Sequence, residues 1–309
     1  MRLSETITHE RLFATLRLPP IPQALLVDCA LALAFALLWW GVAMLLLPTE
    51  AVNILTDQHD IFMPAGRAIA NPYMVGGYFN PPWAAALLAP FSWLPLSLSA
   101  LAQLALYFVL LTLIIHKFGG GRSAVLLTLT SFIALNSATE LNVEWMVCIG
   151  LLVPTRWSLP FLLIKPQTAL GYVLSFRWRD WVYAVLYALI FGFFALLLWG
   201  HLIPQMIDQA AKASGMLRAF NAAPMALIGA PLSLVIGILL AGFGLRRRDP
   251  ALGILAGMFF MPYLALYGML LHLALLATRA PRAALIASLV IWVIFGGMLS
   301  QHLWTLLAR

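Results

Sequence analysis

The sequence predicts an all-α, polytopic integral membrane protein with about ten transmembrane helices. Of its 309 residues, 63% are hydrophobic and 9% are charged, whereas a soluble domain has roughly 25% charged residues. Segments such as 25–48 and 283–304 are apolar on every face and reach the length of about 20 residues that a helix needs to cross a bilayer. Backbone groups cannot stay unpaired in hydrocarbon, so we expect these spans to be helical.

The apolar segments define a single transmembrane domain, 1–309, with one long loop after the first span and another after the seventh. The ten candidate spans are 24–48, 82–97, 99–116, 123–139, 143–155, 158–175, 182–199, 226–245, 251–275 and 283–304. Basic residues cluster before the first span and after the sixth and eighth, which predicts that both termini and residues 246–249 are cytoplasmic. The loops 49–81 and 200–225 are then extracytoplasmic.

An alternative topology has eight crossings plus two half-spans. Segments 82–97 and 143–155 are short and contain or end in proline, so each is expected either to cross or only to dip into the membrane. With ten crossings Lys117 and Arg122 lie outside; with eight they join the other basic clusters inside. The two topologies therefore differ in the side on which residues 118–122 lie.

The composition also bounds the partners and cofactors. The net charge of +7 is explained by topology and by contact with anionic membrane lipids, and without a polar domain we expect no nucleic-acid binding. The acidic and His residues show no metal-ligand spacing, so no metal and no cofactor are predicted. Cys29 and Cys148 lie in apolar segments and are interpreted as core residues without a disulfide.

The first extracytoplasmic loop carries the densest group of acidic residues. Glu50, Asp57 and Asp60 fall close together with His59 between them. One interpretation is a solvated loop without further function. The other is a short surface helix over 57–71, returned to the bilayer by a Gly- and Pro-rich turn, which presents carboxylates to a lipid-linked substrate.

The same loop resembles the first outward loop of GT-C glycosyltransferases. The matching residues are Asp60-x3-Pro-Ala-Gly-Arg67, Asn71-Pro-Tyr73 and Tyr78-Phe-Asn-Pro-Pro-Trp83. Further matches are Leu163-Ile-Lys165-Pro-Gln167, Arg177-Trp-Arg179 and Met261-Pro-Tyr263. More narrowly, the chain is similar over roughly residues 24–270 to bacterial polyprenyl-phosphate-mannose-dependent mannosyltransferases and their uncharacterised relatives.

This resemblance implies a function and a set of site residues. It implies a hexosyltransferase of the cell (inner) membrane that moves a sugar, mannose or a similar hexose, from a polyprenyl phosphate to a lipid or glycan acceptor with inversion. Asp60 matches the loop acid and is the expected general base, with Asp57 as the second candidate. The expected substrate- or phosphate-binding residues are His59, Arg67, Tyr73, Tyr78, Lys165, His201, Lys212 and Arg218. The long loops of GT-C enzymes after spans one and seven favour ten crossings.

Lys165 also has a structural interpretation. It lies within an apolar span, where a charge is costly unless it is paired. It is expected either to pair with Glu140 or Glu144 or to contact the substrate.

The chain departs from the family in ways that leave other functions open. Relatives often carry Tyr-Asp near the ninth span where this chain has Tyr267-Gly268, and the chain is shorter than many of them. A non-catalytic GT-C-like scaffold subunit of a larger membrane complex is the first alternative. A transporter or lipid flippase is the second, although no inverted repeat is visible.

Overall fold

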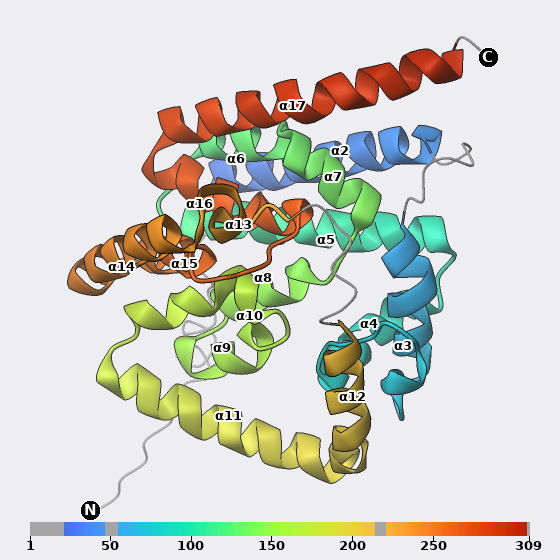
Figure 1. Ribbon diagram of the computed structural model, residues 1–309, viewed down its shortest axis with the longest axis vertical. Coiled ribbons are helices and arrows are strands. Elements are labelled where there is room, and N and C mark those ends of the chain that lie inside the picture. The colour runs from blue at the N-terminus through green and yellow to red at the C-terminus, as the bar shows by residue number, and fades with distance from the viewer. Residues whose placement is uncertain (1–21, 47–54, 214–220, 308–309) are drawn as a thin grey trace, which may run out of the picture.

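The computed structural model describes residues 22–46, 55–213 and 221–307, which form helices joined by non-helical connections and contain no strand (Figure 1). Asn221 and Ala265 form an isolated bridge. The elements are α2 (Gln23–Leu46), η1 (Asp57–Phe62), α3 (Met63–Arg67), η2 (Pro72–Met74), α4 (Pro82–Ser92), α5 (Leu96–Lys117), α6 (Arg122–Leu129), α7 (Phe132–Glu140), α8 (Glu144–Leu152), α9 (Thr155–Leu162), α10 (Pro166–Ala169), η3 (Leu170–Ser175), α11 (Trp178–Trp199), η4 (Gly200–Leu202), α12 (Ile203–Ala213), α13 (Pro224–Ile228), α14 (Ala230–Arg247), α15 (Pro250–Met258), η5 (Leu266–Met269), α16 (Leu270–Arg279) and α17 (Pro281–Leu307).

Within the described part of the chain, four helices are long and apolar enough to cross a membrane. They comprise residues Gln23–Leu45, Leu96–Lys117, Trp178–Gln209 and Ala230–Arg247. Their outward faces are apolar: Leu197 in α11 is 66% exposed and Ile238 in α14 is 63% exposed. An apolar surface of this kind is suited to lipid, so these helices indicate a membrane protein.

Several of the predicted spans are not single helices, and three of them are interrupted at a proline. Segment 82–97 contains α4, whose 11 residues reach only about 16 Å, and a break that ends at Pro95. Segment 158–175 is divided at Lys165-Pro166 into α9, α10 and η3, and 251–275 is divided around Pro262 between α15 and η5. Proline lacks a backbone N–H and disfavours the helical conformation of the residue before it, which accounts for each break.

Ion pairs hold several helix ends together at one end of the bundle. Asp28 of α2 accepts from His116 Nε2 at 2.9 Å and from Arg122 Nε at 2.7 Å. Arg279 binds Asp249 through Nε at 2.7 Å and donates to the Phe118 carbonyl, also at 2.7 Å. We call this the Asp249 end.

These contacts decide between the two predicted topologies at residues 118–122. Arg279 touches both Phe118 and Asp249, so segments 118–122 and 246–249 lie at the same end. The ten-crossing topology puts them on opposite sides and is wrong on this point, whereas the eight-crossing alternative puts them together.

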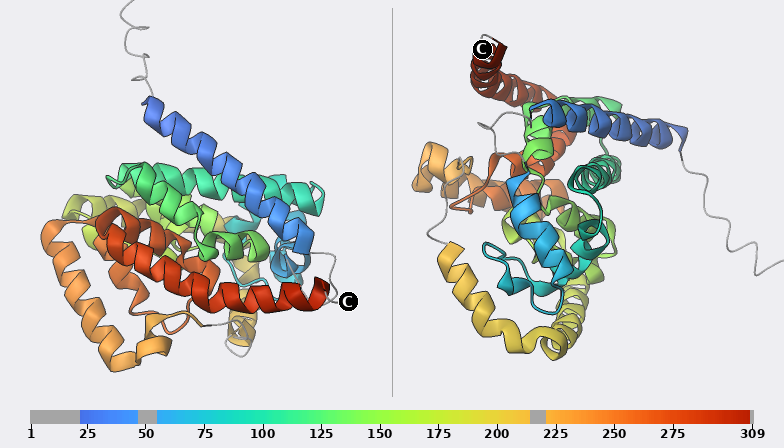
Figure 2. Two further views of the ribbon diagram at one scale, coloured as in Figure 1. Left: turned by 90° about the horizontal axis from the view of Figure 1, so that it is seen from above. Right: turned by 90° about the vertical axis from the view of Figure 1, so that its right-hand side faces the viewer.

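Helices α15 and α16 form a hairpin, and this changes the direction of the last helix. Asp249 precedes α15 and Arg279 ends α16, and the two are ion-paired, so the prediction of 251–275 as one crossing is wrong. Helix α17 therefore starts at the Asp249 end and runs in the same direction as α2 (Figure 2). Trp292 of α17 packs on Trp39 of α2, with ring centroids 6.5 Å apart. The start of α2 and the end of α17 lie at opposite ends of the bundle. The termini, 1–21 and 308–309, whose predicted location is cytoplasmic, lie outside the described residues.

The opposite end of the bundle gathers the two long loops. Trp199, at the end of α11, donates from Nε1 to the Ile69 carbonyl at 2.9 Å, and Gln209 of α12 reaches the Tyr73 carbonyl at 3.5 Å. Leu55 donates its backbone N–H to the Thr139 carbonyl at 2.8 Å. We call this the Asp57 end; in Figure 1 it is the side on which α3, α4 and α12 lie.

Candidate functional site

Four segments that are distant in the sequence bring polar side chains together at the Asp57 end. Asp57 comes from η1, Asn142 and Glu144 from the start of α8, Lys165 from the break before α10, and Tyr267 from η5. Each residue lies at a helix end or break, where the chain leaves the regular bundle. We call these five residues the Asn142 cluster.

The Asn142 amide joins the other segments. Its Nδ2 donates to Asp57 Oδ2 at 3.2 Å and to the Tyr267 hydroxyl at 3.0 Å. Its Oδ1 accepts from Lys165 Nζ at 3.1 Å and from the Val143 backbone N–H at 2.8 Å. These bonds use both amide protons and both acceptor positions, so the orientation of the side chain is fixed.

Lys165 is paired inside the cluster. Its ammonium forms an ion pair with Glu144, and only 13% and 2% of the two side chains are exposed. The ammonium also lies over the Tyr267 ring, 4.8 Å from the ring centroid, a distance typical of a cation–π contact. Of the two predicted structural partners of Lys165, Glu144 is therefore the one that forms the ion pair.

Asp57 is half-buried, and its pKa is raised above the ordinary 3.8. Burial is the main cause, and the charges of Glu144 and Asp60 add to it; Lys165 and the Asn142 hydrogen bond oppose it. A carboxylate with a raised pKa is a better proton acceptor near neutral pH than an ordinary one. Asp57 thus has the electrostatic character expected of a general base.

The backbone on both sides of the cluster is strained. Leu55 and Leu141 have φ angles of 58° and 26°, a region that costs non-glycine residues about 1–3 kcal/mol. Leu55 precedes Asp57 by two residues, and Leu141 directly precedes Asn142. Strain at two such positions is characteristic of functional sites, where the surrounding structure maintains an unfavourable conformation.

A buried chain of side-chain hydrogen bonds fixes the π-helical turn η1 on the bundle. Gln58 and Gln103 both donate to Ser99 Oγ at 3.1 Å, and Trp145 donates to Gln103 Oε1 at 3.2 Å. Because Gln58 points into the core, its neighbour Asp57 is held beside Asn142. Single π-helical turns are rare and are frequently found at functional sites.

The predicted loop acid Asp60 does not join the cluster. Its side chain is 58% exposed, and its carboxylate contacts His59 Nδ1 at 2.5 Å. Arg67 is exposed and donates from Nε to the Ser92 carbonyl at 2.7 Å. The geometry therefore brings Asp57, and not Asp60, into the Asn142 cluster.

The other predicted binding residues have mixed positions. Tyr73 and Tyr78 are buried and donate to the carbonyls of Asn80 and Pro81 at 3.1 and 3.0 Å; burial raises the pKa of Tyr73 to about 12. These tyrosines stabilise the turn into α4. His201 is exposed in η4. The Lys212 side chain and all of Arg218 lie outside the described residues.

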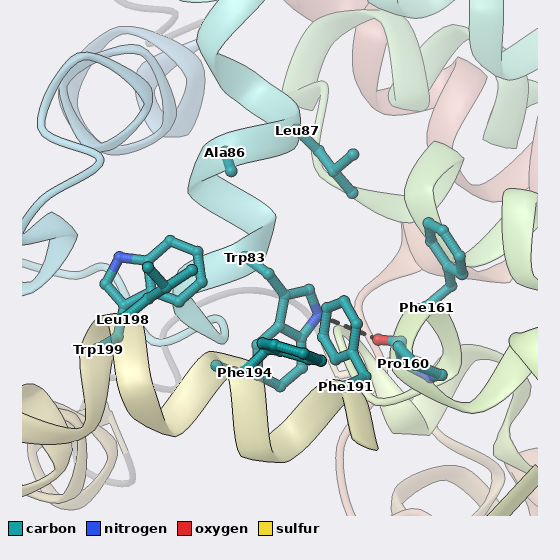
Figure 3. Close-up of a pocket in the computed structure, with 10 residues that line it drawn as sticks. Trp83, Ala86, Leu87, Pro160, Phe161, Phe191, Phe194, Leu198 and Trp199 are labelled. Carbon is teal, nitrogen blue, oxygen red and sulfur yellow. Dashed lines mark hydrogen bonds between the residues drawn. The ribbon is translucent and has the colours of Figure 1, made fainter. Parts of the chain in front are cut away.

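An apolar cavity of about 300 Å³ lies between α4, α9 and α11 (Figure 3). Trp83 forms one wall, donating from Nε1 to the Pro160 carbonyl at 3.1 Å and packing edge-on against Phe191. Its lining is Trp83, Ala86, Leu87, Pro160, Phe161, Phe191, Phe194, Ala195, Leu198 and Trp199. Helix α9 links this cavity to Lys165, three residues beyond its end.

Sequence reasoning missed Asn142 and Tyr267 as site residues. Asn142 lies between Glu140 and Glu144, where one apolar segment ends and the next begins, and Tyr267 follows the proline that breaks another. Irregular backbone at membrane depth is tolerated mainly where it is buried in protein or lines a cavity. Polar residues at interruptions of apolar segments were therefore the sequence signal that could have identified Asn142 and Tyr267. Among the described residues, no group of three or more His, Cys, Asp or Glu side chains is arranged to hold a metal ion.

Comparison of the chain with protein-family models, with curated proteins and with solved structures finds no match.

Proposed function

We propose that the chain is a membrane glycosyltransferase that moves a hexose from a polyprenyl phosphate to an acceptor hydroxyl, with Asp57 as the general base. The observation that carries the proposal is the half-buried Asp57 carboxylate, held by Asn142 next to Lys165 and Tyr267. The proposal includes an extracytoplasmic orientation of the Asp57 end and a location in the inner membrane. The GT-C resemblance of the first loop supports the same reaction class.

In the proposed reaction Asp57 acts on the acceptor hydroxyl, and the polyprenyl phosphate is the leaving group. Asp57 takes the proton of the acceptor hydroxyl as the acceptor oxygen bonds to the anomeric carbon. The bond from that carbon to the phosphate oxygen breaks, its electron pair leaves with the polyprenyl phosphate, and the configuration inverts. A base whose pKa is raised toward neutrality is effective in this role.

The leaving phosphate needs a cationic partner, and Lys165 is the candidate, because it binds the same Asn142 amide as Asp57. Lys165 would exchange part of its contact with Glu144 for a phosphate oxygen, as a charge-assisted hydrogen bond. The apolar cavity beside α9 is suited to the first isoprene units of the donor. Membrane lipids and other subunits of a membrane complex are the further partners that the proposal includes.

One observation favours a second candidate, a non-catalytic scaffold subunit. Lys165 is already paired with Glu144, and the Asn142 amide has no free hydrogen-bonding position. A network that satisfies itself in this way also suits a purely structural role.

A transfer assay separates the two candidates. The purified chain in nanodiscs is mixed with polyprenyl-phosphate-linked hexoses labelled in the sugar and with a lipid and glycan extract as acceptor. Transfer of label that depends on the chain supports the transferase. Absence of both transfer and donor hydrolysis with every donor in the panel favours the scaffold.

A further inference from the structure

Helix α12 begins where the chain has completed a membrane crossing. Helix α11 has 22 residues, which extend about 33 Å, and the hydrocarbon core of a bilayer is about 30 Å thick. The chain therefore reaches the membrane surface near Trp199. There α11 gives way to η4, and α12 runs across the direction of α11 instead of continuing it (Figure 1). Helix α12 thus lies along the membrane surface at the Asp57 end.

One face of α12 packs on the rest of the protein. Leu202, at the turn into the helix, is buried, and Met206, one turn later, is half-buried against the hydrophobic core. Gln209 donates to the Tyr73 carbonyl of the first loop at 3.5 Å. Because positions 202, 206 and 209 have i, i+4, i+7 spacing, they share one side of the helix. This face holds α12 on the bundle and on the first loop.

A second face of α12 is apolar and exposed. Ile203 and Ile207 are 38% and 60% exposed, and Ala211, one turn further on, is also exposed. Their i, i+4, i+8 spacing puts them in one stripe along the helix. The stripe follows the last turn of α11, where Leu197 and Leu198 are exposed as well. The lipid-facing surface of α11 therefore continues onto α12.

A third face of α12 is polar and exposed. It carries Gln205 and Asp208, which are three residues apart and so lie on the same side. Gln205 is two residues from both Ile203 and Ile207, which puts it about 160° around the helix from each. An exposed apolar stripe opposite an exposed polar one, on a helix that lies along the membrane surface, fits the boundary between lipid and water.

We propose that α12 binds the lipid surface of the bilayer, with Ile203 and Ile207 among the acyl chains and Gln205 and Asp208 facing water. Burial of the apolar stripe drives this contact. Because Gln209 is bonded to the first loop, the same contact holds that loop, which carries Asp57, at the level of the lipid headgroups. The inference concerns the membrane contact alone and holds whether or not the chain is a transferase.

Site-directed fluorescence quenching tests the inference. In a background without Cys29 and Cys148, Ile207→Cys and Gln205→Cys each carry a bimane label in phosphatidylcholine nanodiscs. Phosphatidylcholine with brominated acyl chains should quench the label of Ile207→Cys several-fold more than that of Gln205→Cys, and iodide in the buffer should show the reverse order. Ile203→Cys provides a second position on the stripe and should behave as Ile207→Cys does.

Two reference positions outside α12 calibrate the quenchers. Leu197→Cys on the outer face of α11 should report the bromolipid, and Arg247→Cys at the Asp249 end should report iodide. Thermal unfolding shows whether each labelled variant is folded. Equal quenching of the Ile207→Cys and Gln205→Cys labels would overturn the inference. Shielding of the Ile207→Cys label from both quenchers would also overturn it, because protein and not lipid would then cover the stripe.

Discussion

The Asp57 carboxylate and the Lys165 ammonium are bound to opposite ends of one amide. Asn142 donates to Asp57 at 3.2 Å and accepts from Lys165 at 3.1 Å. The amide keeps the charges near each other and prevents a direct ion pair, while Glu144 is the direct partner of Lys165. Burial therefore still raises the pKa of Asp57, and the carboxylate keeps an oxygen for another ligand.

The raised pKa of Asp57 predicts the acidic limb of the pH–rate profile. A base must be ionised, so kcat/KM for the acceptor should rise with pH through a pKa above the ordinary 3.8. Removing Lys165 by Lys165→Met should move this limb to still higher pH, because the ammonium lowers the pKa of Asp57. The profile of Lys165→Met lying at lower pH than that of the wild type would contradict this electrostatic account.

Asp57→Asn and Asp249→Asn should change stability with opposite signs. A raised folded-state pKa means that the stability Asp57 contributes is present at low pH and is lost as the pH rises through that pKa. The amide introduced by Asp57→Asn cannot ionise, so this variant should be as stable as the wild type or more stable at pH 7.

For Asp249, burial raises the pKa, but the Arg279 hydrogen bonds and charge lower it more, and backbone N–H groups help. Its contribution is present at neutral pH and is lost as the pH falls through the lowered pKa. Asp249→Asn should therefore lose about 1–3 kcal/mol at pH 7 and approach the wild type in acid. Thermal unfolding between about pH 2 and pH 8 checks both variants. A large loss of stability in Asp57→Asn at pH 7 would count against the raised pKa of Asp57.

The ion pairs of Arg279 predict which segments are labelled together. In a background without Cys29 and Cys148, Gly121→Cys and Arg247→Cys should react with an impermeant thiol reagent from the same side of the membrane. Met74→Cys, 79% exposed in the first loop, should react from the other side. Labelling of Gly121→Cys together with Met74→Cys would contradict the arrangement of the helix ends.

Close glycine contacts predict sites where one methyl group is costly. A Cβ on Gly171 would overlap the Gly253 carbonyl oxygen, and one on Gly253 would lie 2.5 Å from the Gly171 oxygen. Gly253→Ala should destabilise the packing of α15 on η3 by roughly 1–3 kcal/mol or more. Gly242→Ala in α14, with nothing within 4 Å, is the control and should be neutral or up to about 1 kcal/mol stabilising. Equal unfolding temperatures for the two variants would show that the packing is looser than described.

Hydropathy predicted the long helices well and the interrupted ones poorly. Predicted spans 24–48, 99–116 and 226–245 correspond to α2, α5 and α14, because a long apolar segment has few alternatives in a membrane. Segment 251–275 is equally apolar but turns back at Pro262. Average hydropathy cannot distinguish a crossing from a hairpin, and the ion pair that reveals the hairpin joins residues 30 positions apart.

The candidate site was predictable only in part for a similar reason. The acidic loop was visible as a cluster of charges, but nothing local distinguished Asp57 from Asp60, three residues later. The distinction comes from Asn142, 85 residues away from Asp57, and from Tyr267, 125 residues from Asn142. Contacts at that separation follow from how the helix breaks pack together, which a single sequence does not specify.

The most direct test compares Asp57→Asn with Asp60→Asn in sugar transfer from a polyprenyl-phosphate donor in nanodiscs. Both variants keep the size of the side chain, and the carbonyl oxygen introduced by Asp57→Asn can still accept from Asn142. The account predicts that Asp57→Asn lowers transfer by roughly 10²- to 10⁴-fold, the usual contribution of a positioned proton acceptor. Asp60→Asn, exposed beside His59, should stay within a few-fold of the wild type. Full activity in Asp57→Asn, or an equal loss in Asp60→Asn, would contradict the assignment of Asp57 as the base.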